Sequence, residues 1–316
     1  MRRHPAPSVA APLAAAALVA AALLLATCSS APKQTDRATD VKNRAADAAL
    51  SGNAYYRQGR YELALQFFTQ ALNENLSVDN EAGVVQSYNS IGRVYLAVGM
   101  NDEAETAFVK ANAIAVRLGG EPLFVTSNNL GELSLRRGDP RGALAIFERV
   151  LEGSLRDVAR DQLALLYHNM GSACKATGDY PRALEWLGKA LEINLGEKLY
   201  EEAAADYYMI ASVLSKQGDY ASAAKNAELA LENDKRMENA LGVTKDLAAL
   251  GLIAARAGDH ASAYGYFERS YLAATALGST ADIRSSLEGL IASGEALGKA
   301  SDVAAYRAAL ASLGSP

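Results

Sequence analysis

The chain has 316 residues and a formal net charge of −5; half of its residues are hydrophobic, but only 7% are aromatic. Strands favour aromatic and β-branched side chains, whereas alanine favours helices, so this alanine-rich composition indicates close-packed helices. Nucleic-acid binders usually carry a basic excess that displaces counterions, so the acidic balance argues against a DNA or RNA partner. Two cysteines, Cys28 and Cys174, are too few for a secreted disulfide scaffold.

The first 27 residues have the three-part layout of a secretory signal peptide. Arg2 and Arg3 supply the positive start, an apolar run covers 9–26, and a polar break follows. The exit reads LATCS and resembles the bacterial lipobox, a Leu and two small residues before a cysteine that is diacylated. This resemblance implies cleavage after residue 27 and lipid attachment at Cys28.

Two details of this exit bear on where the protein is expected to reside. Ser29 follows the cysteine and matches the sorting pattern of outer-membrane lipoproteins in double-membrane bacteria, which implies a lipid-anchored protein of the cell envelope that faces the periplasm. Thr27 departs from the usual Gly, Ala or Ser, so an uncleaved membrane anchor stays open as the alternative. Residues 28–40 are polar with mixed charge and are expected to form a flexible tether.

The rest of the chain, 41–316, repeats itself about every 40 residues. A glycine recurs in this register at Gly59, Gly99, Gly138, Gly178, Gly218, Gly258 and Gly298. Around the first six of these glycines, small residues recur seven positions before and five positions after, and a Phe, Leu or Ala recurs nine positions after; the last repeat has lost the Ala and the Phe. Such self-similarity is the sequence signature of a solenoid built from stacked supersecondary units.

Each recurring feature has a physical role in a hairpin of two helices. The glycine is expected to end the first helix in a left-handed conformation. An aspartate that follows it, as in Asp139 and Asp179, would cap the second helix, and Pro140 would occupy a first helical position. The small residues are expected where the two helices cross, and the Phe row is expected between consecutive hairpins.

The segments YNSIGRVYLAVGMNDEAETAFVKA (88–111) and YHNMGSACKATGDYPRALEWLGKAL (167–191) resemble the tetratricopeptide repeat family, in its 40-residue-period subclass. The resemblance implies an all-α, right-handed α-solenoid of antiparallel helix hairpins. Six repeats are expected at about 41–79, 80–119, 120–159, 160–199, 200–239 and 240–279, followed by a degenerate capping repeat over 280–314.

The sequence offers little material for catalysis. His4, His168 and His260 are the only histidines, and no metalloprotease, paired-cysteine, phosphate-loop or dinucleotide motif is present. Cys174 takes a position held by tyrosines in other repeats, which favours a buried thiol over a redox role. We therefore expect no enzyme activity, no cofactor and no metal site.

In the resembling family, the inner, concave wall is built from set positions of the first helix of each repeat. Carried onto this chain, the register predicts a groove with polar, aromatic and basic members. These are Asn53, Arg57, Asn89, Arg93, Asn128, Arg136, His168, Lys175, Tyr208, Lys216, Lys245 and Arg256. Asn129 and Asn169 are expected instead to brace neighbouring helices by hydrogen bonds to backbone groups.

The predicted wall carries seven cations and only one carboxylate, Glu132. Such a stripe favours an acidic partner segment or a free C-terminal carboxylate. A structural alternative stays open for Arg57, Arg136, Lys216 and Arg256, because they lie in the last turn of a helix, where the dipole stabilises any cation by about 0.3–1 kcal/mol.

Together these features predict a membrane-anchored scaffold or adaptor of the bacterial cell envelope, which binds a peptide or helix of a protein partner in its concave groove. The alternative is a periplasmic module that binds a small molecule and is associated with solute uptake. In that case, Tyr56, Tyr208 and His168 would line a narrow lumen.

Overall fold

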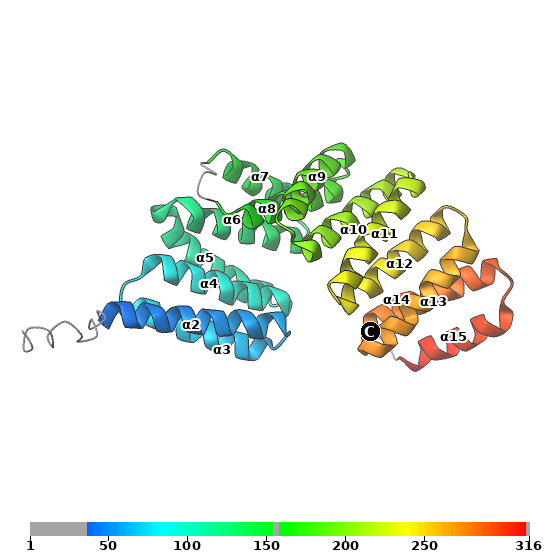
Figure 1. Ribbon diagram of the computed structural model, residues 1–316, viewed down its shortest axis with the longest axis horizontal. Helices are drawn as coiled ribbons and strands as arrows, with labels where there is room; N and C mark the ends of the chain where they lie inside the picture. Colours follow the sequence, from blue (N-terminus) through cyan, green and yellow to red (C-terminus); the bar gives the residue numbers. More distant parts are fainter. Residues whose placement is uncertain (1–36, 154–157, 314–316) are drawn as a thin grey trace, which may run out of the picture.

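The computed structural model describes residues 37–153 and 158–313 (Figure 1). The signal peptide, Cys28 and most of the tether lie outside the described residues, so the expectations for them stay predictions. Within the described residues every regular element is an α-helix, and no helix there is long and apolar enough to cross a membrane.

The helices form seven consecutive antiparallel hairpins. Their first helices are α2 (Arg37–Arg57), α4 (Glu81–Ala97), α6 (Gly120–Arg136), α8 (Arg160–Thr177), α10 (Tyr200–Gln217), α12 (Ala240–Arg256) and α14 (Thr280–Ala296). Their second helices are α3 (Tyr61–Ser77), α5 (Asn101–Leu118), α7 (Pro140–Leu151), α9 (Tyr180–Gly196), α11 (Tyr220–Arg236), α13 (His260–Leu277) and α15 (Ala300–Ser312). The predicted all-α solenoid of helix hairpins is confirmed.

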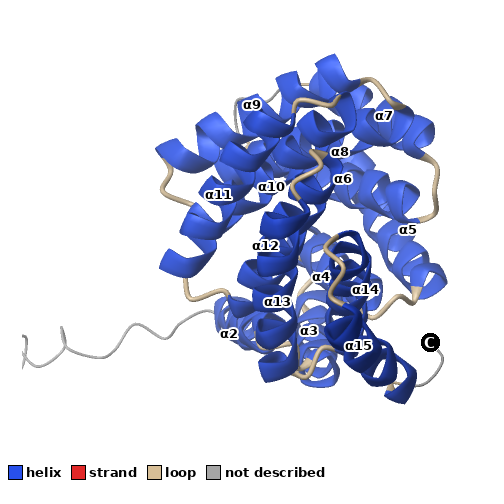
Figure 2. Cartoon of the chain, turned by 90° about the vertical axis from the view of Figure 1, so that its right-hand side faces the viewer, coloured by secondary structure: helices blue, strands red, loops and turns tan. Residues whose placement is uncertain are grey.

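The hairpins stack into an arc whose inner wall consists of the first helices (Figures 1 and 2). Each first helix contacts the first helix of the next hairpin, from α2 with α4 through to α12 with α14. Among the described residues, no Cα atoms of two second helices come within 8 Å of each other, although side chains bridge them, as Arg182 of α9 does to Glu148 of α7 at 2.8 Å. First helices therefore crowd along the shorter, concave side, and second helices fan out on the convex side.

The turns between helices follow the predicted chemistry. All seven recurring glycines have positive φ, for example 83° at Gly178 and 85° at Gly218, which an L side chain adopts only with strain. The Asp179 carboxylate, next along the chain, accepts a hydrogen bond from the Arg182 backbone N–H at 3.3 Å, and Asp139 caps α7 in the same way. α7 begins at Pro140, as expected.

In four hairpins of the described residues, a phenylalanine ring of the second helix packs directly on a glycine of the first helix. In α6 and α7, a Cβ added to Gly131 would lie 2.1 Å from Cε1 of Phe147, a side chain with no solvent exposure. Phe108 is seated in the same way on Gly92. The rings therefore fill the crossing inside their own hairpin, in addition to the predicted space between hairpins.

Candidate partner-binding groove

Two hollows lie on the inner wall of the arc. The first, the N-terminal cavity, measures about 500 Å³ and is formed by α2, α4, α6 and the start of α8; Asn53, Gln86, Arg93 and Val125 are among its lining residues. The second, the C-terminal cavity, measures about 400 Å³ and is formed by α8, α10, α12 and the turn between α11 and α12. Both are lined mainly by first-helix residues. Of the predicted groove residues, Asn53, Asn89 and Arg93 line the N-terminal cavity, and His168, Tyr208 and Lys245 line the C-terminal cavity.

The predicted groove residues are not equally accessible. Seven are exposed, three are half-buried and two are buried. The exposed residues are Asn53, Arg57, Arg93, Arg136, Lys216, Lys245 and Arg256; the half-buried ones are His168, Lys175 and Tyr208; the buried ones are Asn89 and Asn128.

Asn128 corrects the prediction, because it is only 1% exposed and lies between repeats; Asn89, only 4% exposed, lines the N-terminal cavity and also holds neighbouring helices together. The Asn89 side-chain amide donates to Thr126 Oγ1 at 2.8 Å, and its oxygen accepts from Asn129 at 3.1 Å. Asn169 donates to the Asn128 oxygen at 3.1 Å. Asn129 and Asn169 thus brace neighbouring helices as expected, but through side chains rather than backbone groups. Buried amides need such partners, which explains why this row is polar.

The cations of the inner wall have few anionic partners. Among the seven, only Arg136 forms an ion pair within the described residues, with Glu132 at 3.3 Å. The Arg93 guanidinium stacks 5.3 Å from the centroid of the Tyr56 ring, and Arg256 donates to the Ser215 hydroxyl at 2.9 Å. The contacts of Arg93 and Arg256 orient these two side chains without neutralising their charge.

Lys175 is the clearest case of an inner-wall cation without a counter-charge. Its ammonium is partly buried and lies 3.6 Å from the Met209 sulfur. Burial, followed by the like charge of Lys216, lowers the pKa of Lys175 below its ordinary value. A lysine whose charged form is disfavoured in this way would be relieved by a nearby anion.

The helix dipole accounts for more of the stripe than the sequence suggested. α8 ends at Thr177, so Lys175 also lies in a last turn, alongside the four cations already assigned to such positions. The dipole explains why cations are tolerated at these helix ends. It does not explain why Arg57, Lys175, Lys216 and Arg256 lack carboxylate partners within the described residues.

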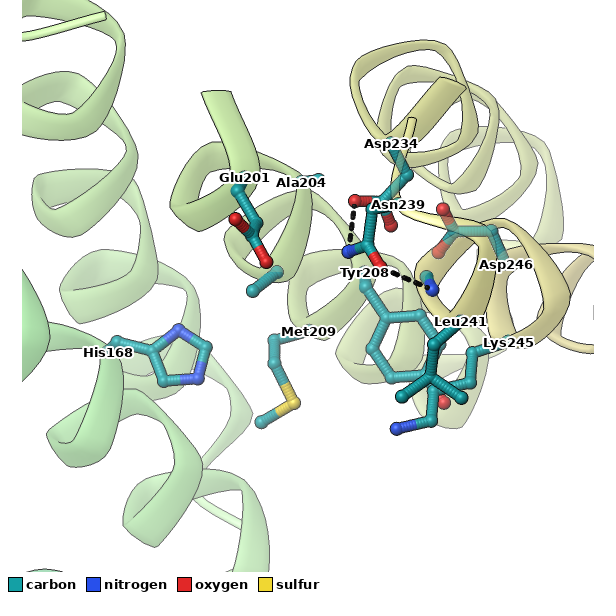
Figure 3. A pocket seen from close by; sticks show the side chains of 12 residues that line it. His168, Glu201, Ala204, Tyr208, Met209, Asp234, Asn239, Leu241, Lys245 and Asp246 are labelled. Carbon is teal, nitrogen blue, oxygen red and sulfur yellow. Dashed lines mark hydrogen bonds between the residues drawn. The ribbon is translucent and has the colours of Figure 1, made fainter. Parts of the chain in front are cut away.

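The sequence analysis missed three buried carboxyl groups: Asp234 and Asp246 line the C-terminal cavity (Figure 3), and Asp206 lies against His168, which also lines it. Asp206 is fully buried; its Oδ1 lies 2.7 Å from His168 Nδ1, and its Oδ2 accepts from the Asn194 amide at 2.7 Å. His168 is therefore engaged with Asp206 as well as lining the cavity. The 40-residue register could have revealed this row, since Ser87, Asp206, Asp246 and Ser286 all stand twelve positions before a turn glycine.

Asp246 is 2% exposed and is paired with Asp234, which is 5% exposed. Burial, then the charge of Asp234 and a hydrogen bond with it, raises the pKa of Asp246 to about 8. Burial also raises the pKa of Asp234. Two adjacent carboxyl groups out of water cannot both ionise, so the pair holds one proton at neutral pH.

The remaining reactive groups have structural surroundings. Cys174 is fully buried, and burial raises the pKa of its thiol, as expected for an inert core cysteine. Within 37–153 and 158–313, no three His, Cys, Asp or Glu side chains are grouped to hold a metal ion.

Comparison with solved structures finds the same architecture at low sequence identity. A Rap protein complexed with competence and sporulation factor is 17% identical with a TM-score of 0.63, over 84% of this chain and 73% of that one. PilW, a type IV pilus biogenesis factor, is 18% identical with a TM-score of 0.54, over 71% and 91%. PilF of Pseudomonas aeruginosa is 17% identical with a TM-score of 0.51, over 73% and 91%. No curated protein sequence matches significantly.

The sequence itself carries the family signature. A tetratricopeptide repeat model matches residues 44–115, 122–196 and 162–236, which together span more than half of the chain. These ranges coincide with the hairpins from α2 to α11 and include the glycine turns and ring-on-glycine contacts described above. The chain belongs to the tetratricopeptide repeat family.

Proposed function

We propose that this protein is a scaffold or adaptor that binds a segment of another protein along its inner wall, and that it does so from a lipid anchor at Cys28 in the bacterial cell envelope. Tetratricopeptide repeats generally act as protein-binding scaffolds without catalytic activity. The bound segment carries acidic side chains or a free C-terminal carboxylate.

The observation that carries the proposal is the set of inner-wall cations without carboxylate partners. Lys175, Lys216 and Arg256 lie at the ends of three successive first helices, and no ion pair of the described residues involves them. By contrast, Arg137 and Arg182, outside this wall, pair with Glu105 and Glu148 at 2.9 and 2.8 Å. An acidic segment would supply the missing counter-charges, with charge-assisted hydrogen bonds stronger than neutral ones.

Support for the acidic segment also comes from the half-buried Lys175. Because burial and Lys216 lower its pKa, an anion that binds beside it would raise that pKa again. The exposed cations of the inner wall are screened by salt, so binding of an acidic segment should weaken as ionic strength rises.

The envelope location is supported by the signal-like leader and by the residues around Cys28, which all lie outside the described residues. One solved structure of similar fold, PilW, is described as a type IV pilus biogenesis factor; likeness at this identity concerns the fold alone. The anchor is tested by metabolic labelling with a radioactive fatty acid. The wild type should incorporate label and fractionate with membranes, and Cys28→Ala should do neither. Equal labelling of both would contradict the anchor.

The groove is tested by crosslinking in intact cells and identifying the proteins captured by a C-terminally tagged chain. The test variant changes Lys175, Lys216 and Arg256 to Gln, which removes three charges and keeps polar side chains. The matched control changes Arg141, Arg149 and Lys225 to Gln, three exposed cations on second helices. A specific envelope protein captured by wild type and control but lost from the test variant supports the proposal. Loss from both, or from neither, places the contact elsewhere.

The small-molecule alternative keeps one specific observation in its favour. His168 and Tyr208, two of the three residues expected to line a lumen, both line the C-terminal cavity of about 400 Å³. A module of this kind would bind its ligand saturably with no protein partner. Absence of any captured protein from all three samples would favour it over the adaptor.

A further inference from the structure

The interface between repeats five and six lacks a hydrogen-bond donor that equivalent interfaces possess. Where repeats one and two meet, the Asn75 amide donates to the Ser87 hydroxyl at 3.3 Å, and Asn80 donates to the Asn75 oxygen at 2.7 Å. At the corresponding positions of repeats five and six, Asn239 donates to Asp234 at 2.9 Å, as Asn80 does to Asn75. Asp234 and Asp246, however, replace the amide and the hydroxyl, so neither ionised side chain can donate to the other.

The interface between repeats four and five shows how a buried carboxylate at this position is satisfied. Asp206, the equivalent of Asp246, receives the Asn194 amide on one oxygen and contacts His168 with the other. One repeat later, Asp234 stands in place of Asn194, and Tyr208 stands in place of His168. Asp246 loses both neighbours, and its Oδ2 is buried without a hydrogen-bond partner among the residues that the structure describes.

An orphaned, buried carboxylate oxygen is costly, because the group has left water without gaining a replacement donor. Asp246 lines the C-terminal cavity, so its missing donor could come from a molecule that enters this space. Figure 3 shows the two carboxyl groups above the Tyr208 ring, with Met209 and Leu241 beside it. The cavity therefore offers anionic groups together with aromatic and apolar surface.

We propose that the Asp234–Asp246 pair and the C-terminal cavity form a binding site for an alkylammonium group, either a free primary amine or a lysine side chain of a peptide. The –NH₃⁺ group donates to the Asp246 Oδ2 and to Asp234, taking the place of the absent amide and imidazole. The alkyl chain lies against Tyr208, Met209 and Leu241. The proton shared by the two carboxyl groups leaves for solvent when the ammonium enters, so charge is balanced at the site.

The surroundings of Asp246 set the charge balance of this site. α10 contributes Glu201 and Tyr208, α11 and the turn after it contribute Asp234 and Asn239, and α12 contributes Lys245. His168 of α8 also lines the cavity. Burial, then the charges of Asp246 and of Asp282 of α14, raises the pKa of Tyr208. In the view of Figure 3, the Lys245 side chain runs below the Tyr208 ring and away from the two carboxyl groups, so it does not occupy the ammonium position.

The test is isothermal titration calorimetry of the purified full chain with n-pentylamine, with Nα-acetyl-lysine amide, and with n-pentanol as the uncharged control. We expect saturable binding of at least one amine and at least tenfold weaker binding of pentanol. Binding of both amines identifies the shared chemistry, whereas binding of the lysine derivative alone identifies a peptide side chain as the source. No binding of either amine at pH 8 would overturn the proposal.

Two variants test whether amine binding depends on the Asp234–Asp246 pair. Asp234→Asn restores the donor seen at Asn194, and Asp246→Asn removes the orphaned carboxylate; each should weaken amine binding at least tenfold. Asp161→Asn, on an exposed carboxylate of α8, is the matched control and should bind like the wild type. A melt followed by circular dichroism confirms that each variant folds. Unchanged affinity in folded Asp234→Asn and Asp246→Asn would overturn the proposal.

The pH dependence gives a second, independent readout. Because the ammonium must displace the shared proton, wild-type affinity should rise by up to tenfold per pH unit between about pH 6 and 8. Asp246→Asn should lose this dependence. The titrations use no protein partner, so their failure leaves the adaptor proposal untouched, and failure of partner capture leaves this site untouched.

Discussion

Replacing Gly131 by Ala tests the packing of a phenylalanine ring on a glycine that four of the hairpins share. The added Cβ would lie 2.1 Å from Cε1, 2.6 Å from Cζ and 2.8 Å from Cδ1 of Phe147, well inside van der Waals contact. Phe147 is fully buried, so its ring cannot swing into solvent to make room. Overpacking of this kind costs about 1–3 kcal/mol.

The same substitution also carries a favourable contribution, because Ala is better than Gly in a helix interior by about 0.5–1 kcal/mol. A net destabilisation of about 1–2 kcal/mol should therefore remain for Gly131→Ala. Gly188→Ala is the matched control: Gly188 is an exposed residue inside α9, and an added Cβ there meets no atom within 4 Å. This control should stabilise the protein by about 0.5–1 kcal/mol.

Urea denaturation followed by far-ultraviolet circular dichroism measures both variants against the wild type. Because each repeat contacts only its neighbours, the loss in Gly131→Ala should be greatest in the hairpin of α6 and α7, which amide hydrogen exchange would resolve. If Gly131→Ala shifted the urea midpoint upward as Gly188→Ala does, the ring-on-glycine account of the core would be refuted.

Three further changes probe the caps and the buried polar groups. Asp179→Ala removes the cap of α9 and should cost about 1 kcal/mol in urea denaturation, whereas Asp179→Asn should keep most of it. Asn169→Ala leaves the buried oxygen of Asn128 without its donor and should cost about 1–3 kcal/mol. A loss of less than half the lower value would argue against these side-chain hydrogen bonds between repeats. The pKa of Asp246 is about 8 in the folded protein, against about 3.9 in the unfolded chain. Between these two pH values the folded state holds an extra proton, so stability falls as the pH rises. In the wild type this contributes a loss of up to about 1.4 kcal/mol per pH unit between about pH 5 and 7, which Asp246→Asn should abolish; parallel pH profiles of wild type and variant would contradict the assignment.

Local chemistry made the helices and turns predictable from the sequence. Gly178 needs a left-handed backbone, Asp179 offers a cap to the next helix, and Pro140 fits a first helical position, so each residue fixes a boundary without knowledge of its distant neighbours. The small residues at helix crossings follow from the same register. The Phe row was only partly anticipated, because its contact with Gly131 and its counterparts depends on how closely the two helices approach.

Side chains on the inner wall were harder to place, because adjacent first-helix positions can face either the groove or the next repeat. Asn128 was assigned to the groove, yet its oxygen accepts from Asn169 in the interface between repeats; Asn89 lines the N-terminal cavity but also donates to Thr126 of the next repeat. The carboxyl pair of Asp234 and Asp246 was missed for a related reason. Aligning the second-helix ends with the next first helices would have placed both residues at the positions of Asn75 and Ser87.

The most direct test of the inner wall as the partner-binding surface is site-specific photocrosslinking in intact cells. A photoreactive phenylalanine is placed at Gln86, an exposed residue of the N-terminal cavity, or at Val109, which is 54% exposed on the second helix α5. The account predicts a specific crosslinked protein from position 86 and none from position 109. A partner crosslinked from position 109 but not from position 86 would contradict it and place the contact on the convex face.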